Sequence, residues 1–395
     1  MLPVKILVVC QFYYPEHFSI TDVARGFAAL GHDVLVVTGK PNYGWGRILD
    51  GYKDIEDEVI HGVRVHRCKL YPRKKSRLSI YRNYLSFWRS SRRYLRKLNE
   101  EFDVVYSMSL SPLISISGGT EYARKHHVRH ILHCLDLWPE SPVITKAIRR
   151  HSLSYGILYR WSKKIYSGLD KILISSPSFE NYFRDELHVN NVPIQYVPQP
   201  PMIGEPKDVV NYEHKVNFVF AGNIGTLQLV ENVVKAVELV KDKMDVCLSI
   251  IGMGARVESV KRLIATRHLE NHVQFYGVRS RESTAGFYVN ATGIIISLTS
   301  QGWVGKTIPG KLNAALYYGR PILACLSGDG RRVLEEAGGA CFASSESEED
   351  IAKAMLELGT KSQEELKKMG ENNKRYFDEN FDTKLVISEI LKALD

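Results

Sequence analysis

Residues 293–326 read GIIISLTSQGWVGKTIPGKLNAALYYGRPILACL. The apolar run at 293–298 has the composition of a buried strand, and the polar residues 299–307 after it predict a loop. Pro309 suits the first turn of a helix, because its φ is already helical and its missing N–H would have no partner there. Gly319 can adopt the left-handed conformation that ends helices, and a second apolar run follows it. The stretch therefore predicts a strand, a loop, a helix and a second strand.

Two lysines lie beside the start of the predicted helix. A loop and a helix N-terminus at the carboxyl end of a strand commonly bind phosphate in α/β proteins, because unpaired N–H groups and the helix dipole both favour an anion. Lys306 and Lys311 would add positive charge at that point. A single lysine in such a place is usually a solvated surface charge, whereas two of them favour a phosphate site.

The length and composition of the chain favour a two-domain globular protein. It has 395 residues, of which 44% are hydrophobic and 25% charged. No apolar run approaches the roughly 20 residues that cross a bilayer. The run at 5–10 is too short for a signal peptide core and predicts a strand, so we expect a cytoplasmic protein. The six cysteines form no CxxC pair, which favours buried reduced thiols over disulfides or zinc.

Strand-like runs alternate with helical patterns or loops along both halves of the chain, which predicts an α/β fold with parallel, doubly wound sheets. The runs lie at 4–9, 33–38, 63–68, 103–107, 130–135, 170–175, 194–197, 216–221, 246–251, 272–276, 293–298 and 321–326. The segment 192–206 carries five prolines and is interpreted as an interdomain linker. We therefore expect two similar βα domains with a cleft between them, followed by a helical tail at 346–395.

The charge is divided unequally between the two halves. Residues 1–200 contain 29 Lys and Arg against 18 Asp and Glu, a net +11, whereas residues 201–395 contain 24 against 26, a net −2. The two halves are therefore expected to face different partners.

Glycines end two of the strand-like runs in the second half. Gly222 and Gly225 flank Asn223, and Gly252 and Gly254 follow the next run. Glycine lets backbone amides approach an anion at a helix start, although βα turns also use glycine for geometry alone. Together with the two lysines of the same half, these loops favour a nucleotide diphosphate.

Several motifs resemble glycosyltransferases of family 4. In the second half these are GNIG at 222–225, Gln228, IGMG at 251–254, VQFYG at 273–277, IPGK at 308–311 and GRP at 319–321. In the first half, YYPE at 13–16, GHDVLVVTGKPNY at 31–43 and DLWPES at 136–141 are similar to the branch that builds capsule and O-antigen repeat units. The resemblance covers nearly the whole chain in order.

The resemblance implies a GT-B fold of two Rossmann-like domains. Residues 1–200 would form the acceptor-binding, membrane-facing domain and 201–375 the nucleotide-sugar domain, and 376–395 would be a helix that crosses back to the first domain. In the family's arrangement, Gly222 to Gly225 and Gln228 would lie along the donor phosphates and sugar. Further donor contacts would come from the glycines of the next loop and from the other residues that the motifs carry: Gly252, Gly254, Tyr276, Val278, Lys306 and Pro309.

Lys311 is the implied catalytic cation, which would neutralise the diphosphate as it leaves. No convincing DxD motif is present, and Asp54–Asp57 is interpreted as a charged surface run, so no metal is expected. The sequence also departs from the family. The usual pair of glutamates falls on Lys306 and Ala314, so the ribose must be held by another residue or held loosely.

Two further departures concern the loops. The histidine common before the first-half aspartate is Leu135 here, and the basic pair of the first donor loop is Asn223 and Gln228.

Asp136 is the candidate acceptor-side catalytic residue. It follows a strand-like run, where a carboxylate could orient or deprotonate a hydroxyl, although aspartate also caps loops and helices well. Glu140 is a weaker catalytic candidate. Glu16, His17 and Trp138 are candidate acceptor-binding residues in the loops after strand-like runs.

The region from Arg64 to Lys97 contains 13 Lys and Arg and no Asp or Glu. Its helical spacing predicts an amphipathic basic helix with aromatics on one face, which could lie on an anionic membrane. The candidate membrane residues are Tyr81, Tyr84, Trp88, Arg92, Arg93, Arg96 and Lys97. The alternatives are an ordinary helix that packs through its aromatic stripe, or nucleic-acid binding, which lacks a recognition motif here. A basic stretch at 146–164 would enlarge the surface.

These features predict a retaining, metal-independent glycosyltransferase, peripheral on the cytoplasmic face of the inner (plasma) membrane. It would move a sugar from a UDP-sugar to a polyprenyl diphosphate-linked saccharide in surface polysaccharide synthesis, with no cofactor and no nucleic acid partner. Retention and acceptor class are what the resemblance implies. The alternatives are a GT-B nucleotide-sugar epimerase, which needs no lipid acceptor, and a non-catalytic GT-B partner subunit.

Overall fold

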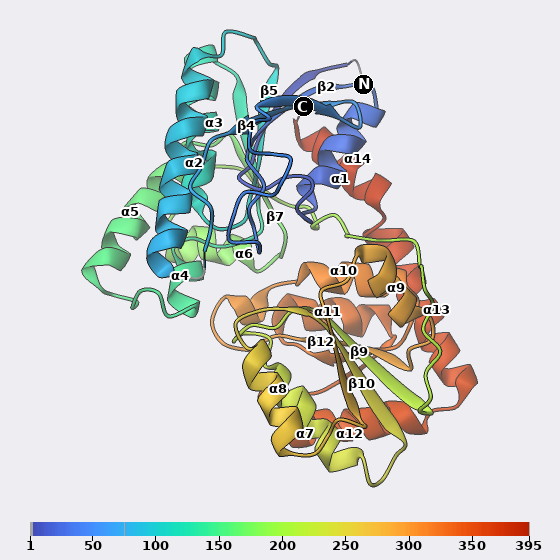
Figure 1. The fold of residues 1–395 in the computed structure, drawn as a ribbon. Coiled ribbons are helices and arrows are strands. Elements are labelled where there is room, and N and C mark those ends of the chain that lie inside the picture. Colours follow the sequence, from blue (N-terminus) through green and yellow to red (C-terminus); the bar gives the residue numbers. More distant parts are fainter. Residues whose placement is uncertain (1–2, 75, 395) are drawn as a thin grey trace. The chain divides into compact units, whose positions relative to one another are not determined.

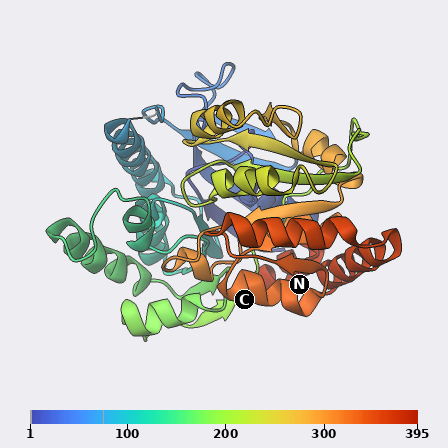
Figure 2. The ribbon, with the colours of Figure 1, turned by 90° about the horizontal axis from the view of Figure 1, so that it is seen from below.

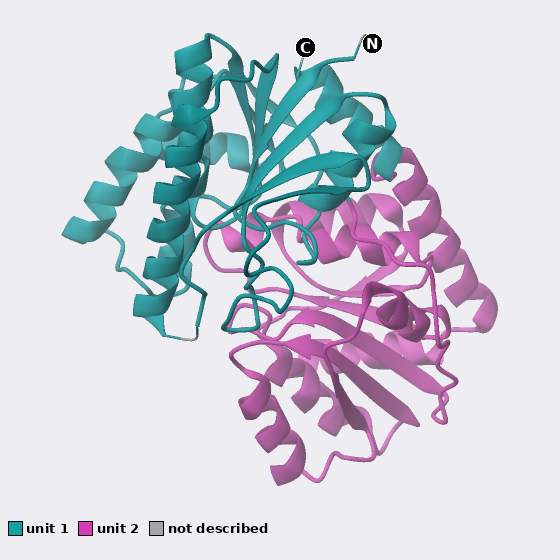
Figure 3. Cartoon of the chain, turned by 45° about the horizontal axis from the view of Figure 1, so that its top comes forward, with its two compact units in different colours: residues 1–200, 383–395 teal, residues 201–382 magenta. Residues whose placement is uncertain are grey.

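A computed structural model describes residues 3–74 and 76–394 of the chain. It divides into two compact units, residues 1–200 with 383–395, and residues 201–382 (Figure 3). The chain leaves the first unit between Pro200 and Pro201, within the proline-rich segment, and returns to it at Thr383. The predicted boundary at 376 falls inside a helix of the second unit, so the crossing segment begins later than the motifs indicated.

The first unit is built on a sheet of eight strands in the order β3-β4-β2-β1-β5-β6-β7-β8. The strands are β1 (Lys5–Val9), β2 (Asp33–Gly39), β3 (Asp57–Ile60), β4 (Val63–Cys68), β5 (Val104–Ser109), β6 (Arg129–Cys134), β7 (Lys171–Ile174) and β8 (Ile194–Tyr196). Neighbouring strands are parallel except β3, which pairs antiparallel with β4 at one edge. The charged run that ends at Asp57 therefore leads into an edge strand and is not wholly a surface loop. The expectation of an all-parallel sheet was wrong at this edge.

Helices cover both faces of this sheet (Figure 1). They are α1 (Ile20–Ala29), α2 (Arg77–Lys97), η1 (Leu113–Ile116), α3 (Ser117–His126), α4 (Glu140–Ile144), α5 (Leu153–Tyr166), α6 (Phe179–Asn181), η2 (Tyr182–Glu186) and α14 (Thr383–Leu394). Successive residues of a strand point to opposite faces. Ile6 and Val8 accordingly pack in one core with α1 and α14, whereas Leu7 and Val9 pack in another with α2 and α3.

The second unit has six parallel strands in the order β11-β10-β9-β12-β13-β14. The strands are β9 (Val216–Asn223), β10 (Val246–Met253), β11 (Val273–Gly277), β12 (Gly293–Ser297), β13 (Ile322–Cys325) and β14 (Ala340–Phe342). The short strand β14 was not predicted, because three residues carry too little periodicity. Its backbone pairs with β13 at the sheet edge.

Helices form two layers around this second sheet (Figure 1). One core joins the sheet to α7 (Val230–Val240), α8 (Val257–Thr266) and α12 (Glu348–Thr360). The other joins it to α9 (Arg281–Val289), α10 (Gly310–Tyr317), α11 (Gly328–Ala337) and α13 (Gln363–Asn380). A 3-10 turn, η3 (Val304–Lys306), precedes α10.

The stretch 293–326 folds as the strand, loop, helix and strand that its sequence predicts. Pro309 lies at the N-cap of α10 with φ −70° and ψ 134°, one position before the first helical residue. Gly319 has φ +58° just after the helix, the left-handed conformation predicted for it. The loop and the helix start therefore lie at the carboxyl end of β12.

Helix α14 completes the core of the first unit. Its residues Ile387 and Ile390 are buried together with residues of α1, and a Cβ at Gly26 would come within 2.3 Å of Ile387 Cδ1. Leu385 on the same helix is 46% exposed. The six cysteines are buried free thiols, as predicted.

We expect Ile390→Ala to lower the free energy of unfolding by about 2–5 kcal/mol, because it removes buried methyl groups and leaves a cavity under α14. The control is Leu385→Ala on the same helix, which should change stability by less than about 0.5 kcal/mol because that side chain is already half solvated. Urea denaturation of the two variants and the wild type measures this. Equal effects of the two substitutions would show that α14 does not pack as described.

Candidate functional site

The candidate residues of the second unit lie where β9, β10 and β12 end. A Cβ on Gly252, which has φ +138°, would lie 1.9 Å from the carbonyl oxygen of Gly222. A Cβ on Gly254, which has φ +159°, would lie 2.2 Å from the oxygen of Ile224. Glycine is therefore required at both positions, because the β10 loop passes directly against the backbone of the β9 loop.

Gln228 closes the first glycine loop from within. Its Oε1 accepts hydrogen bonds from the backbone N–H of Gly225 at 3.1 Å and from Asn223 Nδ2 at 3.2 Å. The N–H of Ile224 is also paired, with Met253 O at 2.8 Å. The amides expected to approach an anion are thus satisfied internally here, and a ligand would have to replace the Gln228 carbonyl to reach Gly225.

Lys311 lies in the first turn of α10, beside Gly222. A Cβ on Gly222 would be 3.7 Å from Lys311 Cδ, and the Lys311 Nζ lies 4.3 Å from the centroid of the Phe220 ring. Its ammonium donates a hydrogen bond to Ser297 O at 3.4 Å. Burial lowers the pKa of Lys311 to about 7. No carboxylate of the described residues forms an ion pair with it, so its charge is available to an anion.

The loop between β12 and α10 is held by Glu346, a residue that the motifs did not indicate. Its Oε1 accepts hydrogen bonds from the Ser300 N–H at 2.8 Å and from the hydroxyls of Ser300 and Thr299 at 3.0 Å, and its Oε2 accepts one from Ser345 at 2.8 Å. Burial raises the pKa of Glu346, but the hydrogen bonds from Ser300, Ser345 and Thr299 outweigh burial and lower it to about 2. The carboxylate therefore stays ionised and fixes the start of the loop.

The end of this loop carries Lys306 on the surface. The Lys306 Nζ lies 4.2 Å from the Trp303 ring centroid, a cation–π contact on an exposed side chain. Ser327, which precedes α11, donates a hydrogen bond to Gly305 O at 2.6 Å. Lys306 thus lies near the N-terminus of α11, whereas Lys311 lies beside Gly222 of the first glycine loop.

The donor-contact candidates Tyr276 and Val278 lie at the end of β11 and just after it. Tyr276 packs edge-on against Phe287 with ring centroids 4.6 Å apart, and Val278 is 57% exposed. Gly277 between them has φ +68°, which turns the chain at the end of the strand. This arrangement leaves an apolar side chain and backbone groups uncovered at the carboxyl edge of the sheet.

In the first unit, a hydroxyl joins two of the predicted residues. Ser111 Oγ donates a hydrogen bond to Asp136 Oδ2 at 3.1 Å and accepts one from Trp138 Nε1 at 3.0 Å. Burial raises the pKa of Asp136, and the hydrogen bonds from Ser111 partly offset it. A raised pKa makes this carboxylate a better proton acceptor. Trp138 itself is only 8% exposed, so it stabilises the site by its hydrogen bond to Ser111 and offers little surface to a ligand.

Glu140 is engaged by other side chains. It accepts a hydrogen bond from the Tyr155 hydroxyl at 3.0 Å and lies 3.5 Å from Arg150 Nη2. The residue is 9% exposed at the start of α4. The structure thus gives Glu140 a place in the packing of α4 against α5, and of the two acceptor-side candidates only Asp136 is kept for a catalytic proposal.

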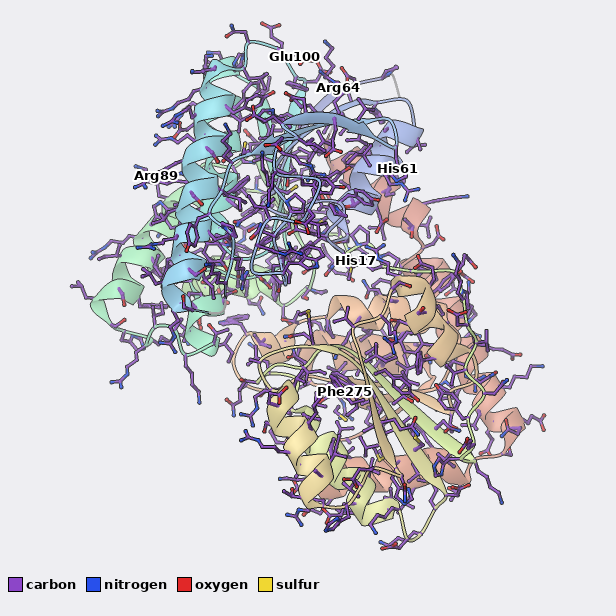
Figure 4. All side chains as sticks on the ribbon, viewed as in Figure 1. His17, His61, Arg64, Arg89, Glu100 and Phe275 are labelled. Atoms are coloured by element: carbon purple, nitrogen blue, oxygen red, sulfur yellow. The ribbon has the colours of Figure 1, made fainter. Side chains whose placement is uncertain are left out.

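Glu16 is buried, which differs from the expected contact with an acceptor. Its Oε1 accepts hydrogen bonds from the N–H groups of Asn42 at 2.7 Å and Tyr43 at 2.6 Å, so it ties the loop after β1 to the loop after β2. Burial raises the pKa of Glu16 to about 7, against the lowering effect of these N–H groups. His17 beside it is exposed at the edge of the sheet opposite the Arg64 and Glu100 ion pair (Figure 4).

A buried polar network continues from Glu16 into α2. Asn42 Oδ1 accepts hydrogen bonds from Asn83 Nδ2 at 3.0 Å and from the Arg73 N–H at 2.9 Å, and Gln11 Nε2 donates to Asn83 Oδ1 at 2.7 Å. Asn83 is fully buried in the middle of the helix. Sequence reasoning missed Asn83, because a single amide within a basic helix has no distinguishing pattern.

Helix α2 packs through a stripe other than the aromatic one. The residues buried on it are Ser79, Asn83, Phe87, Ser91 and Leu95, spaced four apart. Tyr81 is 48% exposed, and Tyr84 and Trp88 are half-buried. The helix is thus packed on the unit, as one alternative expected, but its buried stripe contains Phe87 and Leu95 and leaves Tyr81, Tyr84 and Trp88 partly exposed. Arg89 and Arg93 lie on the outward side, and Figure 4 shows Arg89 pointing away from the sheet.

Two of the predicted membrane residues have a protein partner. Glu121 of α3 lies 2.5 Å from Arg92 Nε and 3.0 Å from Arg96 Nε. Arg93 and Lys97 form no ion pair with any residue in 3–74 or 76–394. The charge available on the outer face is therefore carried by Arg89, Arg93 and Lys97 more than by the paired arginines.

No helix within residues 3–74 and 76–394 combines the length and the apolar character that spanning a bilayer requires. No group of three or more His, Cys, Asp or Glu side chains within the same ranges could hold a metal ion.

Family models match both units. Residues 18–200 match the glycosyl transferase 4-like domain, and residues 205–376 match the glycosyl transferases group 1. A probable glycosyltransferase, WbjE of Pseudomonas aeruginosa, is 25% identical over 217 residues, or 51% of this chain and 53% of that protein. An uncharacterized glycosyltransferase of Methanocaldococcus jannaschii, MJ1069, is 26% identical over 255 residues, or 62% and 63%. The chain thus spans between half and two thirds of the length of these curated relatives.

Solved structures show the same arrangement of elements at lower identity. Anabaena Alr3699/HepE, solved in complex with UDP and glucose, superposes with a TM-score of 0.71 at 12% identity and covers 99% of both chains. WaaG, a glycosyltransferase involved in lipopolysaccharide biosynthesis, gives 0.68 at 12% identity over 99% of both chains. At this identity the likeness concerns the fold.

We expect stability to depend on pH through Glu16. Its folded-state pKa of about 7 lies above the ordinary value of 4.5, so the folded state loses stability as pH rises from about 4.5 to about 7. The shift corresponds to a loss on the order of 3 kcal/mol. Glu16→Gln keeps an acceptor oxygen for Asn42 and Tyr43 and has no proton to lose, so it should lack this loss. Urea denaturation at pH 5 and pH 8 tests this, and an equal pH dependence in both proteins would refute it.

Proposed function

Because the chain belongs to the glycosyltransferases that join a 4-like domain to a group 1 domain, and has the predicted GT-B fold, we propose a more specific activity for it. It transfers a sugar from a nucleotide donor, a UDP-sugar, to a polyprenyl diphosphate-linked saccharide, with retention of configuration and without a metal. The observation that carries the donor part is Lys311, a cation without a carboxylate partner among the described residues, placed beside the glycine loop at the carboxyl edge of the sheet.

Lys311 suits a diphosphate leaving group for an electrostatic reason. Its amine lies in a partly desolvated place, where a charge interacts more strongly than in water. Charge develops on the diphosphate as the bond between the sugar C1 and the phosphate oxygen breaks. The Lys311 ammonium would neutralise that charge, which is the task a metal performs in other glycosyl transfers. UDP bound to Anabaena Alr3699/HepE, which has the same fold, supports a uridine donor.

Asp136 would position the acceptor in the first unit. Its Oδ2 is fixed by Ser111, and its raised pKa suits a hydrogen bond with the attacking hydroxyl. The acceptor oxygen forms the new bond to C1, the bond from C1 to the diphosphate breaks, and the hydroxyl proton passes to the diphosphate oxygen. Asp136 orients the hydroxyl for this attack, and the nucleoside diphosphate leaves with the proton.

The lipid-linked acceptor and the location at the cytoplasmic face of the inner membrane rest on the outer surface of the first unit. Helices α2 and α5 lie on the same side of this unit in two perpendicular views (Figures 1 and 2). Leu78 and Leu85 are 61% and 40% exposed on α2, and Leu153 and Ile157 are 84% and 58% exposed on α5. Apolar side chains among arginines and lysines fit an anionic lipid surface. The structural likeness to WaaG favours surface polysaccharide synthesis.

Ala314 stands where the family has the glutamate that holds the ribose, so binding of the ribose needs a test of its own. The epimerase alternative differs from the transferase because it needs no acceptor. An epimerase would convert the nucleotide sugar without a lipid, so product analysis with the donor alone separates the two activities. Calorimetry with UDP, GDP and CMP identifies the base, and it would also show how strongly the ribose is held without that carboxylate.

We expect Lys311→Ala to lower the rate of sugar transfer by roughly 100-fold, because the leaving diphosphate loses its counter-charge. Lys261→Ala is the matched control, since the Lys261 Nζ also lies over a phenylalanine ring, 4.8 Å from the centroid of Phe275, on α8 (Figure 4). The control should keep full activity. The measurement is UDP release with UDP-sugars and a lipid-linked acceptor, and full turnover by Lys311→Ala would remove the assigned role.

UDP binding should also take up protons near pH 7.5. The free Lys311 amine has a pKa of about 7, so much of it is neutral at that pH, and a bound diphosphate raises the pKa again. Titration calorimetry in buffers of different ionisation enthalpy measures this uptake. The uptake should vanish in Lys311→Ala, and identical proton release or uptake in both proteins would contradict the assignment.

Neutralising Arg89, Arg93 and Lys97 together to Gln should weaken binding to phosphatidylglycerol vesicles by roughly 100-fold, at about 1 kcal/mol for each charge. The control changes Lys353, Lys367 and Lys368 to Gln, three exposed lysines of the second unit. Vesicle pelleting measures both variants. An equal loss in the control would mean that net charge alone decides binding, and no loss in either would remove the membrane proposal.

A further inference from the structure

Arg73 is a half-buried arginine without an acidic partner. It lies in the segment between β4 and α2 of the first unit. Two other arginines of this unit that are not fully exposed do pair with carboxylates, Arg64 with Asp33 and Arg67 with Glu58. In the described ranges, no carboxylate lies within ion-pair distance of Arg73. A guanidinium held away from acids keeps its N–H groups available to an anionic ligand.

The backbone around Arg73 is fixed before any ligand binds. Its N–H donates to Asn42 Oδ1 at 2.9 Å, and the N–H of Lys74 donates to Ser79 Oγ at 2.7 Å. Asn42 is in turn held by Glu16 through its own N–H and by Asn83 through its side chain. The root of the Arg73 side chain is therefore preorganised, which reduces the entropy that binding would cost.

Two tyrosine rings hold the guanidinium itself. The Arg73 Cζ lies 4.9 Å from the ring centroid of Tyr43 and 5.6 Å from that of Tyr84. Tyr43 is fixed by Glu16 at its N–H and packs edge-on against Phe12 and Phe18, at 5.1 and 5.3 Å. Aromatic contacts orient a planar guanidinium, and the N–H groups that do not bond to the Tyr84 hydroxyl can form bidentate bonds to oxygen.

Tyr84 connects this arginine electrostatically to the candidate catalytic carboxylate. Burial raises the pKa of Tyr84, the Arg73 charge and a hydrogen bond from the Arg73 side chain lower it, and the charges of Tyr43 and Asp136 raise it. Tyr84 is therefore within electrostatic reach of both Arg73 and Asp136.

Exposed apolar side chains lie next to Arg73 along the chain. Leu78 is 61%, Tyr81 48% and Leu85 40% exposed in the first half of α2, which begins four residues after Arg73. A ligand that joins phosphate groups to a hydrocarbon chain matches this order of charge and apolar surface. We propose that Arg73, held between Tyr43 and Tyr84, binds the diphosphate of the lipid-linked acceptor. The assignment of that ligand rests on the proposed function.

The test uses geranyl diphosphate, a short soluble isoprenoid diphosphate, and titration calorimetry with the full chain. UDP in excess is present throughout, so that the probe does not bind at Lys311. We expect Arg73→Gln to weaken binding at least tenfold and Arg73→Lys to weaken it less, because lysine keeps the charge but loses the planar fork. Arg82→Gln is the matched control, since Arg82 also lies over a tyrosine, 5.9 Å from the Tyr71 ring centroid, on the exposed side of α2. It should bind within twofold of the wild type.

Each other outcome would overturn the assignment. Equal binding by Arg73→Gln and the wild type would show that the diphosphate lies elsewhere. An equal loss in Arg82→Gln would indicate general surface charge, and an equal loss for geraniol, which has no phosphate, would indicate altered packing. If Arg73→Gln lost binding to phosphatidylglycerol vesicles but bound geranyl diphosphate as the wild type does, Arg73 would be a contact of a lipid headgroup instead.

The failure of the wild type to bind UDP, measured separately, would contradict the donor proposal. It would not change the result for geranyl diphosphate, so the two proposals fail independently.

Discussion

The strands of a parallel sheet all end at the same edge, and the loops that leave this edge bring together residues far apart in the sequence. In the first unit, the neighbouring strands β1, β2, β5 and β6 bring the loops of Glu16, Asn42, Ser111 and Asp136 to that edge. In the second unit, β9, β10 and β12 do the same for the two glycine loops and Lys311. Parallel pairing of the backbone therefore decides where each candidate site can form, and side chains decide what it can bind.

The ionisable groups at these edges fall into two kinds. Glu346 and Glu140 have their charge satisfied by hydrogen bonds or by an arginine, which is how a protein lowers the cost of partly burying a carboxylate. Lys311 and Arg73 are shielded by aromatic rings but have no carboxylate partner among the described residues. A partly buried cation without a counter-ion costs free energy in the empty protein, and an anionic ligand can recover it. This difference separates the residues that build the loops from those proposed to bind phosphates.

Glu16, Asn42 and Asn83 link the edge of the first sheet to helix α2, so the acceptor side and the proposed membrane side share one polar network. The network has a cost and a benefit. Buried amides and carboxylates must all find partners, but once satisfied they fix the loops more rigidly than apolar packing does. Tyr43 and Arg73 are placed by this network and not by the core, which is why no hydrophobic pattern indicates them.

The sequence by itself determined the alternation of strands and helices, and it predicted that the glycines of the two loops, Lys311 and Asp136 lie at or near strand ends. Each of these features depends on local composition or on a motif of a few residues. The sequence did not determine β3 or β14, whose short runs gain their pairing only from β4 and β13. The tertiary structure alone decided that Glu16 is buried, that Gln228 pairs with Gly225 and that α2 packs through Ser79, Asn83 and Ser91. Small and polar side chains carry no hydrophobic period, so only the partners that the fold brings to them reveal which face of a helix is inside.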